Sequence, residues 1–172
     1  METWEKDYLK EEYFKLQDQY EDFDRRALQI KGWIGAGAIA GMAIGFDSGK
    51  SGDGAIWVLI AIMAGCFWYL EAKWKVFQYA LAGRIRMIEA LFRGDEGILI
   101  EETKPLQMYC WWFESYREGI PIYPCEKGKR PEKEKISLRE AAFQGFVMMP
   151  YALIVVICVT LTAYEATARF VK

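Results

Sequence analysis

The stretch GWIGAGAIAGMAIGF, residues 32–46, decides the fold of this chain. It carries no charge, and Gly37, Gly41 and Gly45 recur at every fourth position. In a helix these glycines share one face, where two backbones can approach closely, and transmembrane helices commonly pack through such small residues. The pattern therefore predicts a membrane-spanning helix. Its glycine face is expected to pack either against a second span of the same chain or against another copy.

Three segments of the chain read as membrane spans. They run from Leu28 to Phe46, from Ala55 to Leu70 and from Phe143 to Tyr164. About 20 apolar residues cross the hydrocarbon core of a bilayer, so the third span is long enough and the second is short. Lys31 lies near the start of the first span, from where its ammonium group can extend toward the interface.

The distribution of basic residues predicts the orientation. Most of the 22 Lys and Arg residues lie before the first span or between the second and third spans. By the positive-inside rule these two regions are cytoplasmic, whereas the loop 47–54 and the C-terminal tail face outside. The first apolar run follows a long charged segment, unlike a secretory signal peptide, so we expect the N-terminus to be retained in the cytoplasm. The predicted location is a membrane, the inner (plasma) membrane of a bacterium.

The predicted fold is all-α, an integral membrane protein with three transmembrane helices and a cytoplasmic helical region. Residues 1–30 form an amphipathic helix, and residues 31–71 form a transmembrane hairpin with a short external loop. Residues 72–140 are the cytoplasmic helical region, and residues 141–172 hold the third transmembrane helix with a short external tail.

The N-terminal helix carries an apolar seam with heptad-like spacing. We expect the seam to pack either on a partner helix of another chain or on a cytoplasmic helix of the same chain. The natural partner is the second span, which is predicted to continue as an amphipathic helix to about Arg93 and to stop at Gly94. The residues of this N-terminal seam are Leu9, Tyr13, Leu16, Tyr20 and Phe23.

The region between the second and third spans is less regular. Pro105 is expected to open a short aromatic helix over Leu106–Tyr116. Ser137 and Glu140 have the spacing of a capping box, so Ser137 is expected to start the helix that becomes the third span, and Pro150 to kink it. A basic stretch precedes this helix and either binds anionic lipid headgroups or only sets topology. The candidate lipid-headgroup residues are Lys127, Lys129, Arg130, Lys133 and Lys135.

The composition argues against several function classes. The chain has no histidine, which removes the commonest general base and most zinc sites. Its four cysteines show no C-x-x-C spacing, so we expect structural or free thiols, no metal site, no disulfide framework and no cofactor. The net charge of −2 argues against direct contact with nucleic acid. The sequence offers no constellation of nucleophile and base, and we predict a protein that is not an enzyme.

Two short patterns imitate functional sites. Gly45 to Ser51 resembles a phosphate-binding loop, but the spacing between its glycines is one residue short and no βα unit surrounds it. Glu71 lies at the cytoplasmic edge of the second span, where an ionisable group is a functional candidate by default. An ion pair with Lys75, four residues later, is the simpler expectation.

The membrane hairpin with its long amphipathic helices resembles the SLATT family of bacterial effectors, two-span proteins associated with nucleotide-sensing antiviral systems. The resemblance covers roughly residues 10–93, including the run Lys73-Trp-Lys-Val-Phe-Gln-Tyr-Ala-Leu81. It implies a membrane-disrupting or pore-forming role that a partner or signal triggers, and it transfers no catalytic residue. The third span departs from the two-span pattern.

Two functions follow as hypotheses. The first is an oligomeric membrane effector of a bacterial defence system, a homo-oligomer assembled through the glycine face and the N-terminal seam. The alternative is a non-enzymatic membrane anchor or accessory subunit that recruits a cytosolic protein partner through residues 72–140. In both cases the lipid bilayer is the first partner. A small channel ranks lowest, because polar residues are lacking within the spans.

Overall fold

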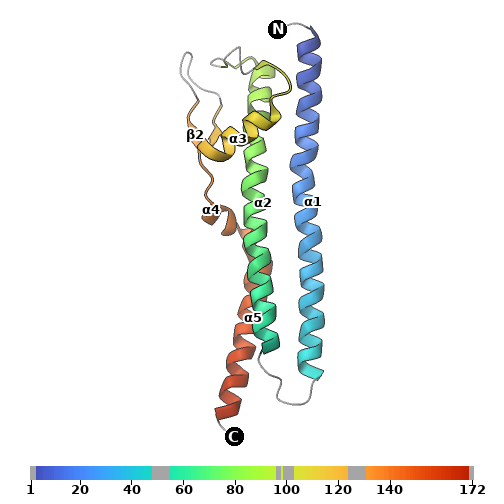
Figure 1. Ribbon diagram of the computed structural model, residues 1–172, viewed down its shortest axis with the longest axis vertical. Helices are drawn as coiled ribbons and strands as arrows, with labels where there is room; N and C mark the ends of the chain where they lie inside the picture. The colour runs from blue at the N-terminus through green and yellow to red at the C-terminus, as the bar shows by residue number, and fades with distance from the viewer. Residues whose placement is uncertain (1–2, 48–54, 96–97, 99–102, 124–130, 171–172) are drawn as a thin grey trace. The chain divides into compact units, whose positions relative to one another are not determined.

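The computed structural model describes residues 3–47, 55–95, 98, 103–123 and 131–170. Within these ranges the chain is mostly helical, as the sequence predicts (Figure 1). Two long helices come first, α1 over Thr3–Asp47 and α2 over Ala55–Arg93. Helix α1 continues unbroken from a charged stretch into an apolar one, and α2 continues from an apolar stretch into a charged one. No proline interrupts either sequence.

The end of α2 confirms the predicted stop. Gly94 has a φ of 79°, a left-handed conformation that glycine adopts without steric cost. The Gly94 amide donates to the Leu91 carbonyl over 3.1 Å, and the Asp95 amide donates to the Ala90 carbonyl over 2.9 Å. These bonds satisfy carbonyls that the helix end would otherwise leave open.

A short aromatic helix and a small strand pair follow. Helix α3 covers Met108–Glu118, whereas we predicted Leu106–Tyr116. It starts later because Leu106 has a φ of 65°, outside the helical range. Strand β1 (Ile120–Pro121) pairs antiparallel with β2 (Lys133–Glu134), a pairing that the sequence did not predict.

A helix starts directly after Ser137, but it does not continue into the third span, in contrast to our expectation. Helix α4 covers only Leu138–Ala142, and a separate helix, α5, covers Gly145–Phe170 with Pro150 inside it. The break lies at Phe143 and Gln144. The Gln144 carbonyl accepts the amides of Val147 and Met148, both over 2.9 Å, and so starts a new helix.

Helices α1, α2 and α5 are each long and apolar enough to cross a membrane. In the most apolar window of each helix, at most 22% of the residues are buried inside the protein. The apolar side chains therefore point outward, where lipid and not water has to cover them. These three helices make the chain a membrane protein.

The chain divides into two compact units. The first, here called the charged unit, comprises residues 1–25 and 74–138, and the second, the apolar unit, comprises residues 26–73 and 139–172. In the charged unit the N-terminal part of α1 packs along the C-terminal half of α2, and α3 lies beside α2 (Figure 1). The buried core of the charged unit consists of Leu9, Leu16, Leu81, Met87 and Ile88.

Candidate functional site

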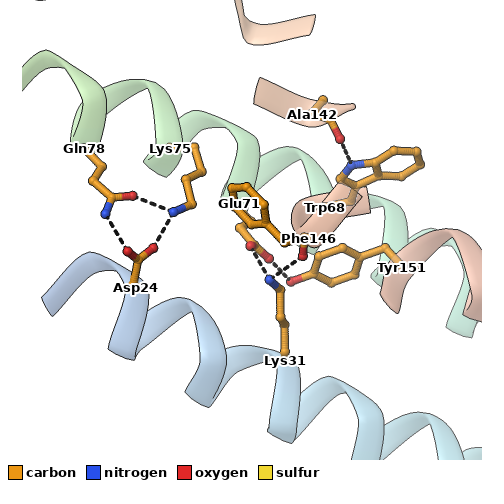
Figure 2. Close-up of polar contacts among 9 residues, drawn as sticks. All are labelled: Asp24, Lys31, Trp68, Glu71, Lys75, Gln78, Ala142, Phe146 and Tyr151. Atoms are coloured by element: carbon orange, nitrogen blue, oxygen red, sulfur yellow. Dashed lines mark hydrogen bonds and ion pairs between the residues drawn. The ribbon is translucent and has the colours of Figure 1, made fainter. Parts of the chain in front are cut away.

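The apolar unit holds a cluster of polar groups at the end of its apolar segments. Its members come from three helices: Lys31 from α1, Glu71 from α2, and Phe146 and Tyr151 from α5 (Figure 2). Lys31 immediately precedes the apolar stretch of α1, and Glu71 immediately follows that of α2. We refer to these groups as the Lys31 cluster.

An ion pair forms the centre of the Lys31 cluster. The Lys31 Nζ lies 2.7 Å from the Glu71 Oε1, and the side chains of Lys31 and Glu71 are 16% and 4% exposed. The Tyr151 hydroxyl donates to the Glu71 Oε2 over 2.7 Å, and Tyr151 is completely buried. A buried charge is costly unless it is both paired and hydrogen-bonded, and Glu71 is both.

A backbone carbonyl completes the cluster. The Lys31 Nζ donates to the Phe146 carbonyl oxygen over 2.8 Å, and the same ammonium lies 5.9 Å from the centre of the Phe146 ring. In a regular helix the amide of residue 150 would bond this carbonyl, but Pro150 has no N–H. Lys31 supplies the donor that Pro150 lacks, and so joins α1 to α5 as well as to α2.

A second bond fixes the break between α4 and α5. The indole Nε1 of Trp68 donates to the Ala142 carbonyl over 2.8 Å (Figure 2). In a continuing helix the amide four residues later would donate to the Ala142 carbonyl, but α4 ends at Ala142. The Trp68 and Phe143 rings meet edge to face at 5.9 Å. The sequence pattern does not predict this contact.

The charged unit has a polar cluster of its own, around Lys75. Its ammonium pairs with Asp24 and donates to the Gln78 Oε1 over 2.7 Å (Figure 2). The Gln78 Nε2 in turn donates to the Tyr20 carbonyl over 2.7 Å and to the Asp24 Oδ2 over 3.0 Å. The predicted ion pair between Glu71 and Lys75 is therefore wrong. Glu71 pairs with Lys31, and Lys75 pairs with Asp24.

The most deeply buried charge of the charged unit is Arg84. Its Nε and Nη2 donate to the two carboxylate oxygens of Glu12, both over 3.0 Å, and the side chains of Arg84 and Glu12 are 0% and 3% exposed. Arg84 also donates to the Lys104 carbonyl over 2.7 Å, and its guanidinium lies 5.7 Å from the Trp111 ring centre. The Leu106 amide donates to Glu12 over 3.0 Å, which holds the backbone at its positive φ.

The predicted glycine face is partly used inside the chain. A Cβ at Gly41 would lie 2.8 Å from the Ile60 Cδ1, and a Cβ at Gly45 would lie 2.6 Å from the Trp57 ring. The small residues therefore let α2 approach α1 at these two positions. Gly37 has no such neighbour within 4 Å. Of the two alternatives that the sequence left open, packing within the chain is the one seen at Gly41 and Gly45.

The N-terminal seam also packs within the chain. Leu9 and Leu16 belong to the buried core, and Tyr13, Tyr20 and Phe23 pack against it. The Tyr13 hydroxyl donates to the Glu89 Oε1 over 3.1 Å. Burial raises the pKa of the Tyr13 phenol, and the bond to Glu89 raises it further. The seam thus meets α2 of its own chain, as one of the two expectations had it.

The predicted lipid-headgroup residues fall into two groups. Lys127, Lys129 and Arg130 lie outside the described residues. Lys133 lies on β2 and pairs with Glu114 over 2.7 Å and with Glu118 over 2.6 Å, while Lys135 is exposed. The hydrogen bond from Lys133 and its charge lower the pKa of the Glu118 carboxyl. Lys133 therefore bridges β2 to α3, and binding of lipid headgroups stays a prediction.

The part of the chain that the structure describes holds no group of three or more His, Cys, Asp or Glu placed to bind a metal ion. Within the same ranges Cys66, Cys110 and Cys158 are free thiols. What the two units display is a set of buried ion pairs that fix helices to one another. Removal of one partner of such a pair leaves a buried charge uncompensated and is strongly destabilising.

Comparison with protein-family models, with curated proteins and with solved structures finds no match to this chain. The resemblance to the SLATT family therefore stays a prediction.

Proposed function

We propose that this protein is a non-enzymatic membrane anchor whose charged unit recruits a cytosolic protein partner. The apolar unit spans the bacterial inner membrane, and the charged unit lies in the cytoplasm. The distribution of Lys and Arg supports this orientation, since most of them belong to the charged unit.

The observation that carries the proposal is an exposed aromatic ridge, formed by Tyr109, Phe113 and Arg117 of α3 together with Leu106, which lies just before the helix. Leu106 is 79% exposed and Tyr109 is 73% exposed. The Tyr109 and Phe113 rings stack at 6.4 Å, and the Arg117 guanidinium lies 5.5 Å from the Phe113 ring centre. Aromatic and arginine side chains are the types that contribute most to binding at protein interfaces.

The rest of α3 is anchored, so the ridge is presented on a rigid support. The Trp112 Nε1 donates to the Phe77 carbonyl over 3.2 Å. Ser115 is buried where α3 crosses α2, and a Cβ at Gly83 would lie only 2.3 Å from the Ser115 Oγ. A preorganised surface loses little conformational entropy when a partner binds. The chemistry of the ridge fits a partner with apolar side chains and a carboxylate that meets Arg117.

The oligomeric effector is less well supported. That hypothesis assigned assembly to the N-terminal seam and the glycine face. Leu9 and Leu16 are buried in the charged unit, and Gly41 and Gly45 contact α2 of the same chain. Of the predicted glycine face Gly37 stays open to a second copy, whereas the α3 ridge offers a larger exposed surface of aromatic side chains.

Site-specific photo-crosslinking in intact cells tests the anchor. A crosslinking amino acid replaces Tyr109 in one variant and Tyr8, a 49% exposed tyrosine of the same unit, in a control. The proposal expects one cytosolic protein attached at position 109 in fixed ratio and absent at position 8. Adducts between two copies of the chain, or adducts with lipid alone, would reject the partner-binding role of the ridge.

A further inference from the structure

The apolar unit has a second polar contact, at the other end of its apolar segments from the Lys31 cluster. The indole Nε1 of Trp57 on α2 donates to the Glu165 Oε1 on α5 over 2.7 Å. Gly45 of α1 lies against the same indole, because a Cβ there would be 2.6 Å from its ring. We refer to this group as the Trp57 contact. It brings together the same three helices as the Lys31 cluster does.

The Lys31 cluster and the Trp57 contact are separated by the same length on all three helices. No charged residue lies between them on any helix. Fourteen residues, or about 21 Å at 1.5 Å per residue, separate Lys31 from Gly45, Trp57 from Glu71, and Tyr151 from Glu165. Because a carboxylate is costly within hydrocarbon, Glu71 and Glu165 mark the two edges of an apolar layer.

The exposed aromatic side chains give the same two edges. Trp33 on α1 and Tyr69 on α2, which are 69% and 57% exposed, each lie two residues inside the Lys31 cluster. Tyr164 on α5, which is 72% exposed, directly precedes Glu165 at the other edge. Trp and Tyr side chains concentrate where a membrane meets water. The outer surface and the buried contacts of the apolar unit therefore indicate one thickness.

This thickness is about 9 Å less than the usual hydrocarbon core of about 30 Å. Tilting a helix shortens its span across the bilayer, so tilt cannot correct the difference. Extension of polar side chains toward the headgroups is restricted as well, because Lys31 is held by both Glu71 and the Phe146 carbonyl. Helix α5 continues past the Lys31 cluster, but there the Phe146 ring lies 5.9 Å from the Lys31 ammonium, beside a charge. The remaining adjustment is a thinner bilayer.

We propose that the apolar unit fits a bilayer whose hydrocarbon core is about 21 Å thick, and that it thins a thicker bilayer around it. The full-length protein is reconstituted into fluid phosphatidylcholine bilayers whose monounsaturated acyl chains run from about 14 to about 22 carbons, and its thermal unfolding is measured in each. We expect the highest Tm with the shortest chains, and a Tm about 5–10 °C lower at about 18 carbons. A maximum at about 18 carbons or longer, or a Tm independent of chain length, would overturn the proposal.

Removing the Lys31 cluster tests which groups set the thickness. Lys31→Leu/Glu71→Leu/Tyr151→Phe extends the uncharged part of α1 back to Ala27 and that of α2 forward to Ala72. The chain length of highest Tm should increase by at least about two carbons. A folded variant whose maximum stays where it is in wild type would contradict the proposal.

A variant on the exposed surface avoids any loss of buried contacts in the Lys31 cluster. Trp33→Leu/Tyr69→Leu removes the two exposed aromatics at that edge, and Trp4→Leu/Tyr8→Leu makes the same changes at 51% and 49% exposed residues of the charged unit. The first variant should move the maximum to longer chains, and the control should keep the wild-type maximum. An identical response of the two variants would overturn the proposal. The outcome does not depend on whether the α3 ridge binds a partner.

Discussion

Lys31 on α1 donates a hydrogen bond over 2.8 Å to the carbonyl oxygen of Phe146 on α5. In a regular helix the amide of residue 150 would donate to this carbonyl, but Pro150 has no N–H. The same ammonium pairs with Glu71 on α2. One side chain thus links the three helices of the apolar unit, and without it the buried Glu71 carboxylate would lose its cation and the Phe146 carbonyl would lose the bond from Lys31.

Replacing Lys31 should therefore destabilise the apolar unit strongly. Lys31→Met leaves the Glu71 carboxylate buried without a cation, which costs about 3–5 kcal/mol. Lys31→Met/Glu71→Gln should recover much of this loss, because a neutral amide still accepts the bond from Tyr151. Thermal unfolding of the detergent-solubilised protein measures both. Equal melting temperatures for wild type and Lys31→Met would contradict the assigned role of the ion pair.

Pro150 and Lys31 should be energetically coupled. In Pro150→Ala the new amide can bond the Phe146 carbonyl, so that carbonyl no longer depends on Lys31. Lys31→Met should then cost less in the Pro150→Ala background than in wild type, by about 1 kcal/mol, the usual worth of one hydrogen bond. A double-mutant cycle of unfolding free energies gives the coupling, and strictly additive costs would speak against it.

Gly45 and Gly37 should respond differently to the same small change. A methyl group at Gly45 meets the Trp57 ring at 2.6 Å. Trp57 is 1% exposed and its Nε1 donates to the Glu165 Oε1 over 2.7 Å, so the ring cannot turn away without loss. Gly45→Ala should cost about 1–3 kcal/mol, as overpacking does, and should alter the emission of Trp57.

Gly37→Ala is the matched control for that overpacking. With no atom within 4 Å, its stability should stay unchanged or rise, since alanine favours the helix. If unfolding in detergent showed the two glycines to be equally tolerant, the close approach of α1 and α2 at Gly45 would be wrong.

The Arg84–Glu12 pair should govern the stability of the charged unit. Arg84→Lys keeps the charge but loses the two parallel bonds to Glu12 and the geometry toward the Lys104 carbonyl. We expect Arg84→Lys to be destabilising and Arg84→Met, which strands the Glu12 carboxylate, to be worse at about 3–5 kcal/mol. Chemical denaturation of the detergent-solubilised protein measures the free energy of unfolding of each variant. An Arg84→Met variant as stable as wild type would refute the burial of a charged pair.

Periodicity and charge were enough to predict the long helices. The apolar run from Gly32 to Phe46 and the repeat that ends at Gly94 depend on local sequence, and both predictions are confirmed. The break at Phe143 was not predictable, because the Ala142 carbonyl is bonded by Trp68, a residue far away in the sequence. A capping-box pattern reports on local backbone bonds and carries no information about such distant donors.

The polar clusters were the least visible feature of the sequence. Arg84 sits next to Ile85 on the predicted apolar face of α2, and a charge at that position was the one available signal for a buried pair. Its partner Glu12 is one of many acidic residues in the N-terminal helix, so only the packing of α1 on α2 distinguishes it. The partner of Lys31 could not be predicted either. Its partner Glu71 is followed four residues later by Lys75, which the sequence offers as an alternative cation.

Native mass spectrometry of the protein purified from the membranes of its own host tests the central claim most directly. The account predicts a complex of this chain with a second, cytosolic polypeptide in fixed ratio. The Tyr109→Ser/Phe113→Ser variant should lose that polypeptide and keep its fold. A closed homo-oligomer without any other polypeptide, unchanged in this variant, would contradict the anchor and favour the effector.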